Sequence, residues 1–260
     1  MPVTAVAATA LTGWQPVPLA RHSGQVARAA GGPGRGSSDP HHQTPGPAPR
    51  LHNLRCPDGM SADFSHRLRV GVMGSAGGEL TPEIIGKCRD LGRAVGRRGH
   101  IMITGACPGL PHFAAEGASA EGGLLVGVSP AMSLWEHINH YHSPHREYDI
   151  IIYTGSGLMG REVAAVRSCD VVIILGGRSG TLGEFAIAFD EGKLIGVLRG
   201  TGGIADHVHE IVAMIQKKTG AEVVYEDDPV ALLDLCEEKH ARRVAAGLLD
   251  RPALTDEDME

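Results

Sequence analysis

The chain has 260 residues, of which 42% are hydrophobic and 21% are charged, and its formal net charge is −6. This acidic balance disfavours non-specific nucleic-acid binding, which requires a basic face, and no apolar run reaches the roughly 20 residues of a bilayer-spanning helix. We therefore expect neither nucleic acid nor a membrane as a partner. The five cysteines are scattered without a Cys-x-x-Cys pair, which disfavours disulfides and a zinc site and favours the reducing cytoplasm.

Residues 1–65 differ in composition from the remainder of the chain. They hold nine of the 16 prolines and eight of the 36 glycines, and they show neither a helical nor a strand-like apolar period. Such a segment buries too little apolar surface to offset its ordering entropy. We predict a disordered tail over 1–65 and a single folded domain over 66–250.

Three origins of this tail are open. A transit peptide is one, because residues 1–38 contain Arg but no Asp or Glu. A genuine flexible extension is the second. The third, which we favour, is a start of translation at Met60, since the sequence from there leads directly into the first predicted strand.

From Leu68 onward, strand and helix patterns alternate along the chain. Strands are predicted at 68–75, 101–107, 124–130, 148–155, 170–177, 193–200 and 221–228. Helices are predicted at 81–99, 111–123, 158–169, 180–192, 203–220 and 229–247, while 131–148 is a longer connecting segment. The first helix has Pro82 near its start and Gly99 at its end.

The predicted strands are continuous runs rich in Val and Ile, without polar alternation. Such strands are covered on both faces, as in a parallel sheet wrapped by helices. The fold class predicted is therefore α/β, a doubly wound Rossmann-like parallel sheet. In this architecture ligands bind beyond the carboxyl ends of the strands.

Four predicted strands end in glycine-containing loops: "MGSAGGE" (73–79), "TGACPGL" (104–110), "TGSGLMGRE" (154–162) and "GGRSGTLGE" (176–184). Glycine lets the backbone turn tightly, and a following helix offers free N–H groups to an anion. None of the loops has the spacing of a dinucleotide fingerprint or a Walker motif. Four such loops indicate a ligand cleft. The residues expected to bind phosphate or nucleotide are Gly74, Ser75, Gly105, Gly109, Gly177, Arg178, Ser179, Gly180 and Thr181.

The fourth loop is the most specific of these. Gly177 and Gly180 permit the turn, and Thr181 can present its hydroxyl and N–H to a phosphate. Glu184 follows one helical turn later, next to Thr181, where it could accept hydrogen bonds from the hydroxyls of an attached sugar. The alternative is a carboxylate placed near the start of the helix only by the macrodipole.

The loop "GGRSGTLGE" resembles the Pro-Gly-Gly-x-Gly-Thr-x-x-Glu motif of the LOG family, the cytokinin-activating phosphoribohydrolases once misnamed lysine decarboxylases. The stretch "GREVAAVRSCDVVIILGGRSGTLGE" aligns with the family without gaps, and "TGACPGL" is similar to its Gly-Gly-x-x-x-Gly-Leu-Met segment. The similarity covers roughly residues 68–220. It implies that Arg161 and Glu184 are catalytic, that nucleoside 5′-monophosphates are hydrolysed to free base and ribose 5-phosphate without a cofactor, and that the protein is at least a dimer.

The chain departs from the LOG pattern at four positions. Gly176 replaces the motif proline, Arg178 and Ser179 replace Gly and usually Tyr or His, and Glu162 replaces a lysine. In these features the sequence is similar to a bacterial branch of the superfamily and to molybdenum-cofactor carrier proteins. A non-catalytic nucleotide or molybdenum-cofactor binder is therefore the alternative to a hydrolase. For Arg161, the alternative is a surface arginine beside Glu162.

Two other activities are disfavoured. A pyridoxal-phosphate decarboxylase needs a Schiff-base lysine, but none of the five lysines lies in a strand-end glycine loop. His137, His140, His142 and His145 lack a helical i, i+4 pair and a neighbouring acid or cysteine at ligand spacing. We expect this segment to line the cleft and not to bind a metal.

Overall fold

The computed structural model describes residues 67–77 and 80–248. The tail predicted over 1–65 and the outermost residues of the predicted domain lie outside this range. The strands are β1 (Arg69–Gly74), β2 (Ile101–Thr104), β3 (Leu124–Ser129), β4 (Ile150–Tyr153), β5 (Val171–Leu175), β6 (Leu194–Leu198) and β7 (Glu222–Glu226). The helices are α1 (Pro82–Arg97), α2 (Leu110–Ala120), α3 (Leu134–Asn139), α4 (Gly157–Arg167), α5 (Ser179–Asp190), the 3-10 helix η2 (Gly203–His207), α6 (Val208–Ile215) and α7 (Pro229–Ala245). None of these helices is long and apolar enough to cross a membrane.

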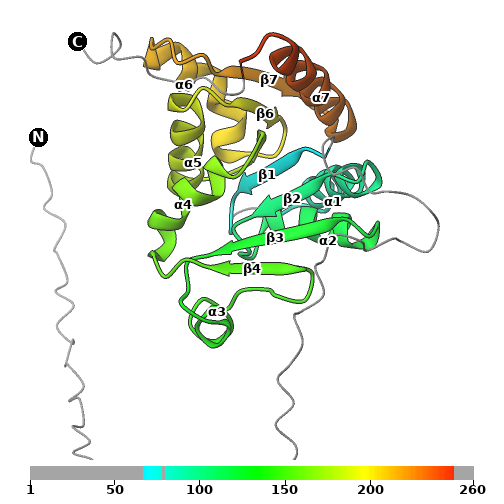
Figure 1. The fold of residues 1–260 in the computed structure, drawn as a ribbon, viewed down its shortest axis with the longest axis vertical. Helices are drawn as coiled ribbons and strands as arrows, with labels where there is room; N and C mark the ends of the chain where they lie inside the picture. The colour runs from blue at the N-terminus through cyan, green and yellow to red at the C-terminus, as the bar shows by residue number, and fades with distance from the viewer. Residues whose placement is uncertain (1–66, 78–79, 249–260) are drawn as a thin grey trace, which may run out of the picture. The chain divides into compact units, whose positions relative to one another are not determined.

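The strands form one parallel sheet in the order β4-β3-β2-β1-β5-β6-β7 (Figure 1). The chain builds outward from β1 to β4, and β5 then returns to pair with the other side of β1. Helices α1, α2 and α7 cover one face, whereas α4, α5 and α6 cover the other (Figure 1). This arrangement confirms the doubly wound Rossmann-like fold. It also creates a switch point between β1 and β5, where Gly74 is in register with Leu175.

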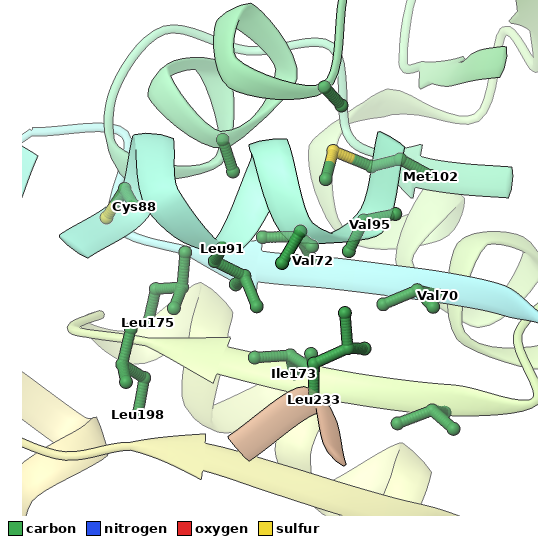
Figure 2. Close-up of a cluster of buried hydrophobic side chains, with 14 of the residues drawn as sticks. Val70, Val72, Cys88, Leu91, Val95, Met102, Ile173, Leu175, Leu198 and Leu233 are labelled. Atoms are coloured by element: carbon green, nitrogen blue, oxygen red, sulfur yellow. The ribbon is translucent and has the colours of Figure 1, made fainter. Parts of the chain in front are cut away.

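Two hydrophobic cores, one on each face, hold the sheet between the helices. On the first face, Leu91 and Val95 of α1 point onto β1 and β5 (Figure 2). On the opposite face, Phe185 of α5 is fully buried against Met73 and its neighbours. Each such side chain contributes about 1.5–3 kcal/mol on burial. The rigid sheet therefore fixes the positions of the strand ends.

Helix α1 shows how local sequence sets an element boundary. The Thr81 hydroxyl accepts a hydrogen bond from the Ile84 N–H at 3.3 Å, Pro82 follows at the first helical position, and Gly99 after the helix has a φ of 69°. These are an N-cap, a preformed first turn and a left-handed stop. The predicted start and end of this helix are thus confirmed.

Two glycines of α1 test how closely this helix packs. A Cβ on Gly92 would lie 1.9 Å from the carbonyl oxygen of Ala114 in α2, whereas a Cβ on Gly86 would meet nothing within 4 Å. We expect Gly92→Ala to lower the free energy of unfolding by about 2 kcal/mol through overpacking. Gly86→Ala should instead raise it by about 0.5–1 kcal/mol, because alanine favours the helix. Urea denaturation of both variants measures this, and equal effects would refute the close α1–α2 packing.

Three details differ from the sequence-based predictions. The helix predicted over 203–220 divides into η2 and α6 and ends at Ile215, because Gln216 adopts left-handed backbone with a φ of 51°. The connecting segment 131–148 contains the short helix α3. Strand β4 is not covered on both faces: Ile150 and Ile152 are 51% and 48% exposed, because β4 is the edge strand of the sheet.

Candidate functional site

A cleft of about 420 Å³ opens at the carboxyl ends of β1 and β5. Its walls come from the loops after β1, β2 and β5 and from the first turns of α4 and α5. The lining residues are Gly74, Ser75, Ala76, Cys107, Leu158, Met159, Arg161, Glu162, Arg178, Ser179, Gly180, Thr181 and Glu184. The cleft therefore lies at the switch point of the sheet, the place where doubly wound folds bind ligands.

The loop after β5 is held in shape by a segment that the sequence analysis did not single out. The carbonyl oxygens of Gly176 and Gly177 accept hydrogen bonds from the N–H groups of Ala205 and Ile204 at 2.9 and 3.0 Å. The Thr201 hydroxyl accepts from the Gly176 N–H at 2.9 Å. Gly177 has a φ of 104°, a conformation that favours glycine. The loop is thus preformed before any ligand arrives.

Helix α5 begins directly at this loop. Its first i→i−4 hydrogen bond runs from the Leu182 N–H to the Arg178 carbonyl at 2.9 Å. The N–H groups of Ser179, Gly180 and Thr181 precede it and have no intrahelical acceptor, so they form the positive end of the helix. The exposed Arg178 side chain lies at the same end of the cleft. This end of the cleft is suited to an anion.

Glu184 lies one turn further along α5 and is only 7% exposed, although it lines the cleft. Within the described residues, no hydrogen bond or ion pair reaches its carboxylate. Burial raises its pKa to about 8; Arg161 lowers the pKa and Glu162 raises it further. A carboxylate placed only by the helix dipole would lie exposed near the first turn. The burial of Glu184 therefore does not fit placement by the helix dipole alone, and its raised pKa makes it a candidate functional residue.

Arg161 is buried in the floor of the cleft, so the alternative of a surface arginine is wrong. Its Nη1 donates to the carbonyl oxygens of Gly105 and, at 2.9 Å, of Val128, while Nη2 donates to the Cys107 sulfur at 3.2 Å. Its Nε is buried without a hydrogen-bond partner in the described structure. In the part of the chain that is described, Arg161 makes no hydrogen bond to Glu184 and acts on that carboxylate through its charge.

Glu162 is the second buried carboxylate of the cleft, at 6% exposure. A Cβ on Gly183 would lie 2.9 Å from its Oε2, and a Cβ on Gly180 would lie 3.4 Å from its Oε1. The carboxylate thus packs over the first turn of α5, where neither residue has a side chain. Burial raises the pKa of Glu162, and neighbouring Arg161 lowers it.

The cleft brings together most of the residues predicted to form the site. Gly105, Gly109 and Gly177 do not line it. A Cβ on Gly105 would lie 2.1 Å from Arg161 Nη1, so this glycine makes room for the guanidinium. Gly109 has a φ of 102°, and a Cβ at this position would lie 2.1 Å from the Ser75 carbonyl oxygen. Glycine at this position therefore allows the loops after β1 and β2 to contact each other. Direct ligand contacts by these three glycines stay predictions.

The cleft also contains apolar side chains that the sequence analysis did not name. Leu158 and Met159 begin α4 and are 55% and 65% exposed, yet both line the cleft. Exposed apolar side chains beside charged ones give a surface on which a flat ring can pack. The sequence feature that could have identified these two residues was their position in the third glycine-containing loop (154–162). Cys107, the half-buried neighbour of Arg161, likewise lies in a loop that had been singled out.

The four histidines of the connecting segment do not line the cleft, contrary to our expectation. His137 is buried, and its ring bonds the Ser129 hydroxyl at 2.8 Å and the Pro144 carbonyl at 2.9 Å. It therefore ties this segment to the end of β3. The spacing of the histidines could not reveal this structural role, because it depends on how the segment folds back onto Ser129 at the end of β3.

A larger hollow, about 740 Å³, lies between α1 and the start of α7. Its charged side chains are already paired: Arg93 with Asp90, and Arg98 with Asp234 and Glu237. It contains none of the strand-end glycine loops. The smaller cleft at the switch point is therefore the candidate site, since its carboxylates lack partners among the described residues.

Comparisons with known proteins identify the family to which the chain is related. The model of the SLOG cluster4 family matches residues 67–233. An uncharacterised protein of Archaeoglobus fulgidus is 33% identical over 132 residues, which are 51% of this chain and 80% of that protein. The resemblance to LOG-like proteins inferred from the motifs is confirmed.

Two solved structures are similar along nearly their whole length. The molybdenum cofactor binding protein of Rippkaea orientalis is 26% identical with a TM-score of 0.53, covering 66% of this chain and 97% of its own. The molybdenum cofactor carrier protein of Chlamydomonas reinhardtii is 25% identical with a TM-score of 0.55, covering 68% and 99%. The predicted relationship to the carrier branch is thereby confirmed.

Proposed function

The chain belongs to the SLOG cluster4 family, and from this premise we propose that its cleft binds nucleoside 5′-monophosphates and hydrolyses their N-glycosidic bond to free base and ribose 5-phosphate. The observation that carries the proposal is Glu184. It is a buried carboxylate that faces the cleft without a partner among the described residues, one helical turn from the anion-binding start of α5. A turn is about 5.4 Å, so a phosphate at the helix start leaves the attached sugar beside Glu184.

The proposed binding mode uses each wall of the cleft. The phosphate accepts hydrogen bonds from the N–H groups of Gly180 and Thr181 and contacts Arg178. The base packs against Leu158 and Met159 on the facing turn of α4. The ribose then lies between the phosphate at the start of α5 and the base beside α4, so its hydroxyls and anomeric carbon come next to Glu184.

Departure of the base leaves positive charge on the anomeric carbon, and the ionised Glu184 stabilises that charge in a buried site. Water bonds the carbon as the C–N bond breaks and passes a proton to Glu184. The departing base takes up a proton from solvent, and Glu184 then releases its proton to solvent, which restores the carboxylate. Arg161, held on two carbonyls, is a positioning residue that favours the ionised carboxylate. Because the pKa of Glu184 is about 8, we expect base release at saturating nucleotide to accelerate as pH rises toward 8.

A second candidate is a non-catalytic binder or carrier of a nucleotide or of molybdenum cofactor. Glu162 favours it, because a second buried carboxylate beside Glu184 works against full ionisation of the pair. The names of the two similar solved structures also support it. For either function we infer a cytoplasmic homo-oligomer. Exposed Trp135, Ile150 and Ile152 near the β4 edge supply apolar surface for self-association.

Incubation of the full-length protein with AMP, GMP, CMP and a cytokinin monophosphate tests these alternatives. We expect chromatography to detect free base with the wild type and none with Glu184→Gln. Glu238→Gln is the matched control, since it removes an exposed carboxylate on α7 outside the cleft. A ligand-induced rise in melting temperature without base release would support the carrier. No rise with any nucleotide or with molybdenum cofactor would exclude both candidates.

A further inference from the structure

The position of Glu162 bears on what charge a ligand can carry. Its carboxylate lies over the first turn of α5, against Gly180 and Gly183, at the end of the cleft where the helix offers its free N–H groups. Among the described residues, no hydrogen bond or ion pair satisfies it, although the side chain is more than nine-tenths buried. When it is ionised, Glu162 thus places a negative charge beside the position where an anion would bind.

The other charged and titratable groups of the cleft do not cancel this charge. Arg161, the neighbour of Glu162 on α4, directs its guanidinium at two carbonyl oxygens and the Cys107 sulfur. Glu184 approaches from α5 as a second carboxylate. Among the described residues that line the cleft, only Arg178, from the loop before α5, is an exposed cation at the anion end. A ligand phosphate would therefore bind one free guanidinium and the helix start while facing Glu162.

We propose that Glu162 is the specificity-determining residue of the cleft and selects nucleotides whose phosphate carries a single negative charge. This rests on the proposed nucleotide-binding function. A phosphodiester or diphosphate-linked nucleotide presents one charge per phosphate, whereas a phosphomonoester presents two above its second pKa of about 6. Within roughly one helical turn, each additional charge facing a buried carboxylate weakens binding by at least about tenfold. The cleft thus favours an esterified phosphate over the free dianion, and a nucleoside 5′-monophosphate binds most tightly as its monoanion.

Two matched ligands isolate this effect: carbocyclic AMP, whose bond to the base resists hydrolysis because its ring has no oxygen, and its methyl ester, which stays singly charged. Calorimetric titration of the full-length protein measures both dissociation constants at about pH 5 and pH 8. We expect the wild type to bind both equally at the lower pH. At the higher pH it should prefer the methyl ester by about tenfold.

Three variants identify the residue responsible. We expect Glu162→Gln to abolish the preference at pH 8 and Glu162→Lys to reverse it in favour of the dianion. Glu238→Gln should keep the wild-type preference. Wild-type protein that binds the dianion as tightly as the ester at pH 8, or Glu162→Gln that retains the preference, would overturn the inference alone. Failure of both ligands to bind any variant would overturn the proposed function with it.

Discussion

Replacing Glu184 with glutamine is expected to raise the free energy of unfolding at about pH 9 by on the order of 3 kcal/mol and to leave it unchanged near pH 4. In the folded protein, burial raises the pKa of Glu184 to about 8, with Arg161 opposing and Glu162 adding to the shift, from an ordinary value of 4.5. Between these values the folded state holds a proton that the unfolded chain has lost. The stability of the wild type therefore falls as pH rises from about 4.5 to about 8 and then levels off.

Glutamine is neutral at every pH and has the shape of the protonated acid. The free energy of unfolding of Glu184→Gln should therefore not fall as the pH rises from about 4.5 to about 8. Urea denaturation of wild type and Glu184→Gln across the pH series measures the difference. Glu238→Gln, an exposed carboxylate paired with Arg242, should follow the wild-type curve. Parallel curves for wild type and Glu184→Gln would show that the buried carboxylate is ionised without cost.

Arg161→Ala is expected to lower the free energy of unfolding by about 4 kcal/mol. The substitution leaves the carbonyl oxygens of Gly105 and Val128 without their charged donor and opens a void where the guanidinium fills the space above Gly105. It also removes the positive charge that opposes the raised pKa of Glu184. The expected loss of stability therefore combines lost buried hydrogen bonds, a void and a lost buried charge. Removal of a surface ion pair has none of these consequences.

Arg167 on the same helix supplies the control. Its side chain is 67% exposed and pairs with Glu191 at 2.6 Å, so Arg167→Ala should cost less than about 1 kcal/mol. Chemical denaturation of the two variants compares them directly. Equal losses would mean that Arg161 does not brace the loops of the cleft, and would remove the physical basis for its positioning role.

The cleft combines rigid loops with carboxylates that lack partners among the described residues. The loops after β2 and β5 are fixed by hydrogen bonds to Arg161 and to the segment 201–205. The two carboxylates receive no such bonds within the described structure. Rigid surroundings with unpartnered acids are typical of sites that recognise or transform a ligand.

The sequence by itself determined the fold class, and it indicated the strand-end loops that line the cleft. Continuous Val- and Ile-rich runs indicate strands covered on both faces, and glycine loops at their ends indicate the cleft. Thr181 and Glu184 lie one helical turn apart, so their proximity follows from local geometry. Such features depend on residues near one another in the chain, and the periodicity of a helix or strand expresses them directly.

Only the tertiary structure decided how the charged groups are used. The burial of Arg161 depends on its hydrogen bonds to Gly105, which follows β2, and to Val128 of β3. The position of Glu162 depends on two glycines of α5. The exposed faces of β4 depend on its place at the sheet edge. Each of these is a contact between segments distant in sequence. Desolvation and electrostatic interaction act through space, so no local pattern reports which carboxylate is buried without a partner.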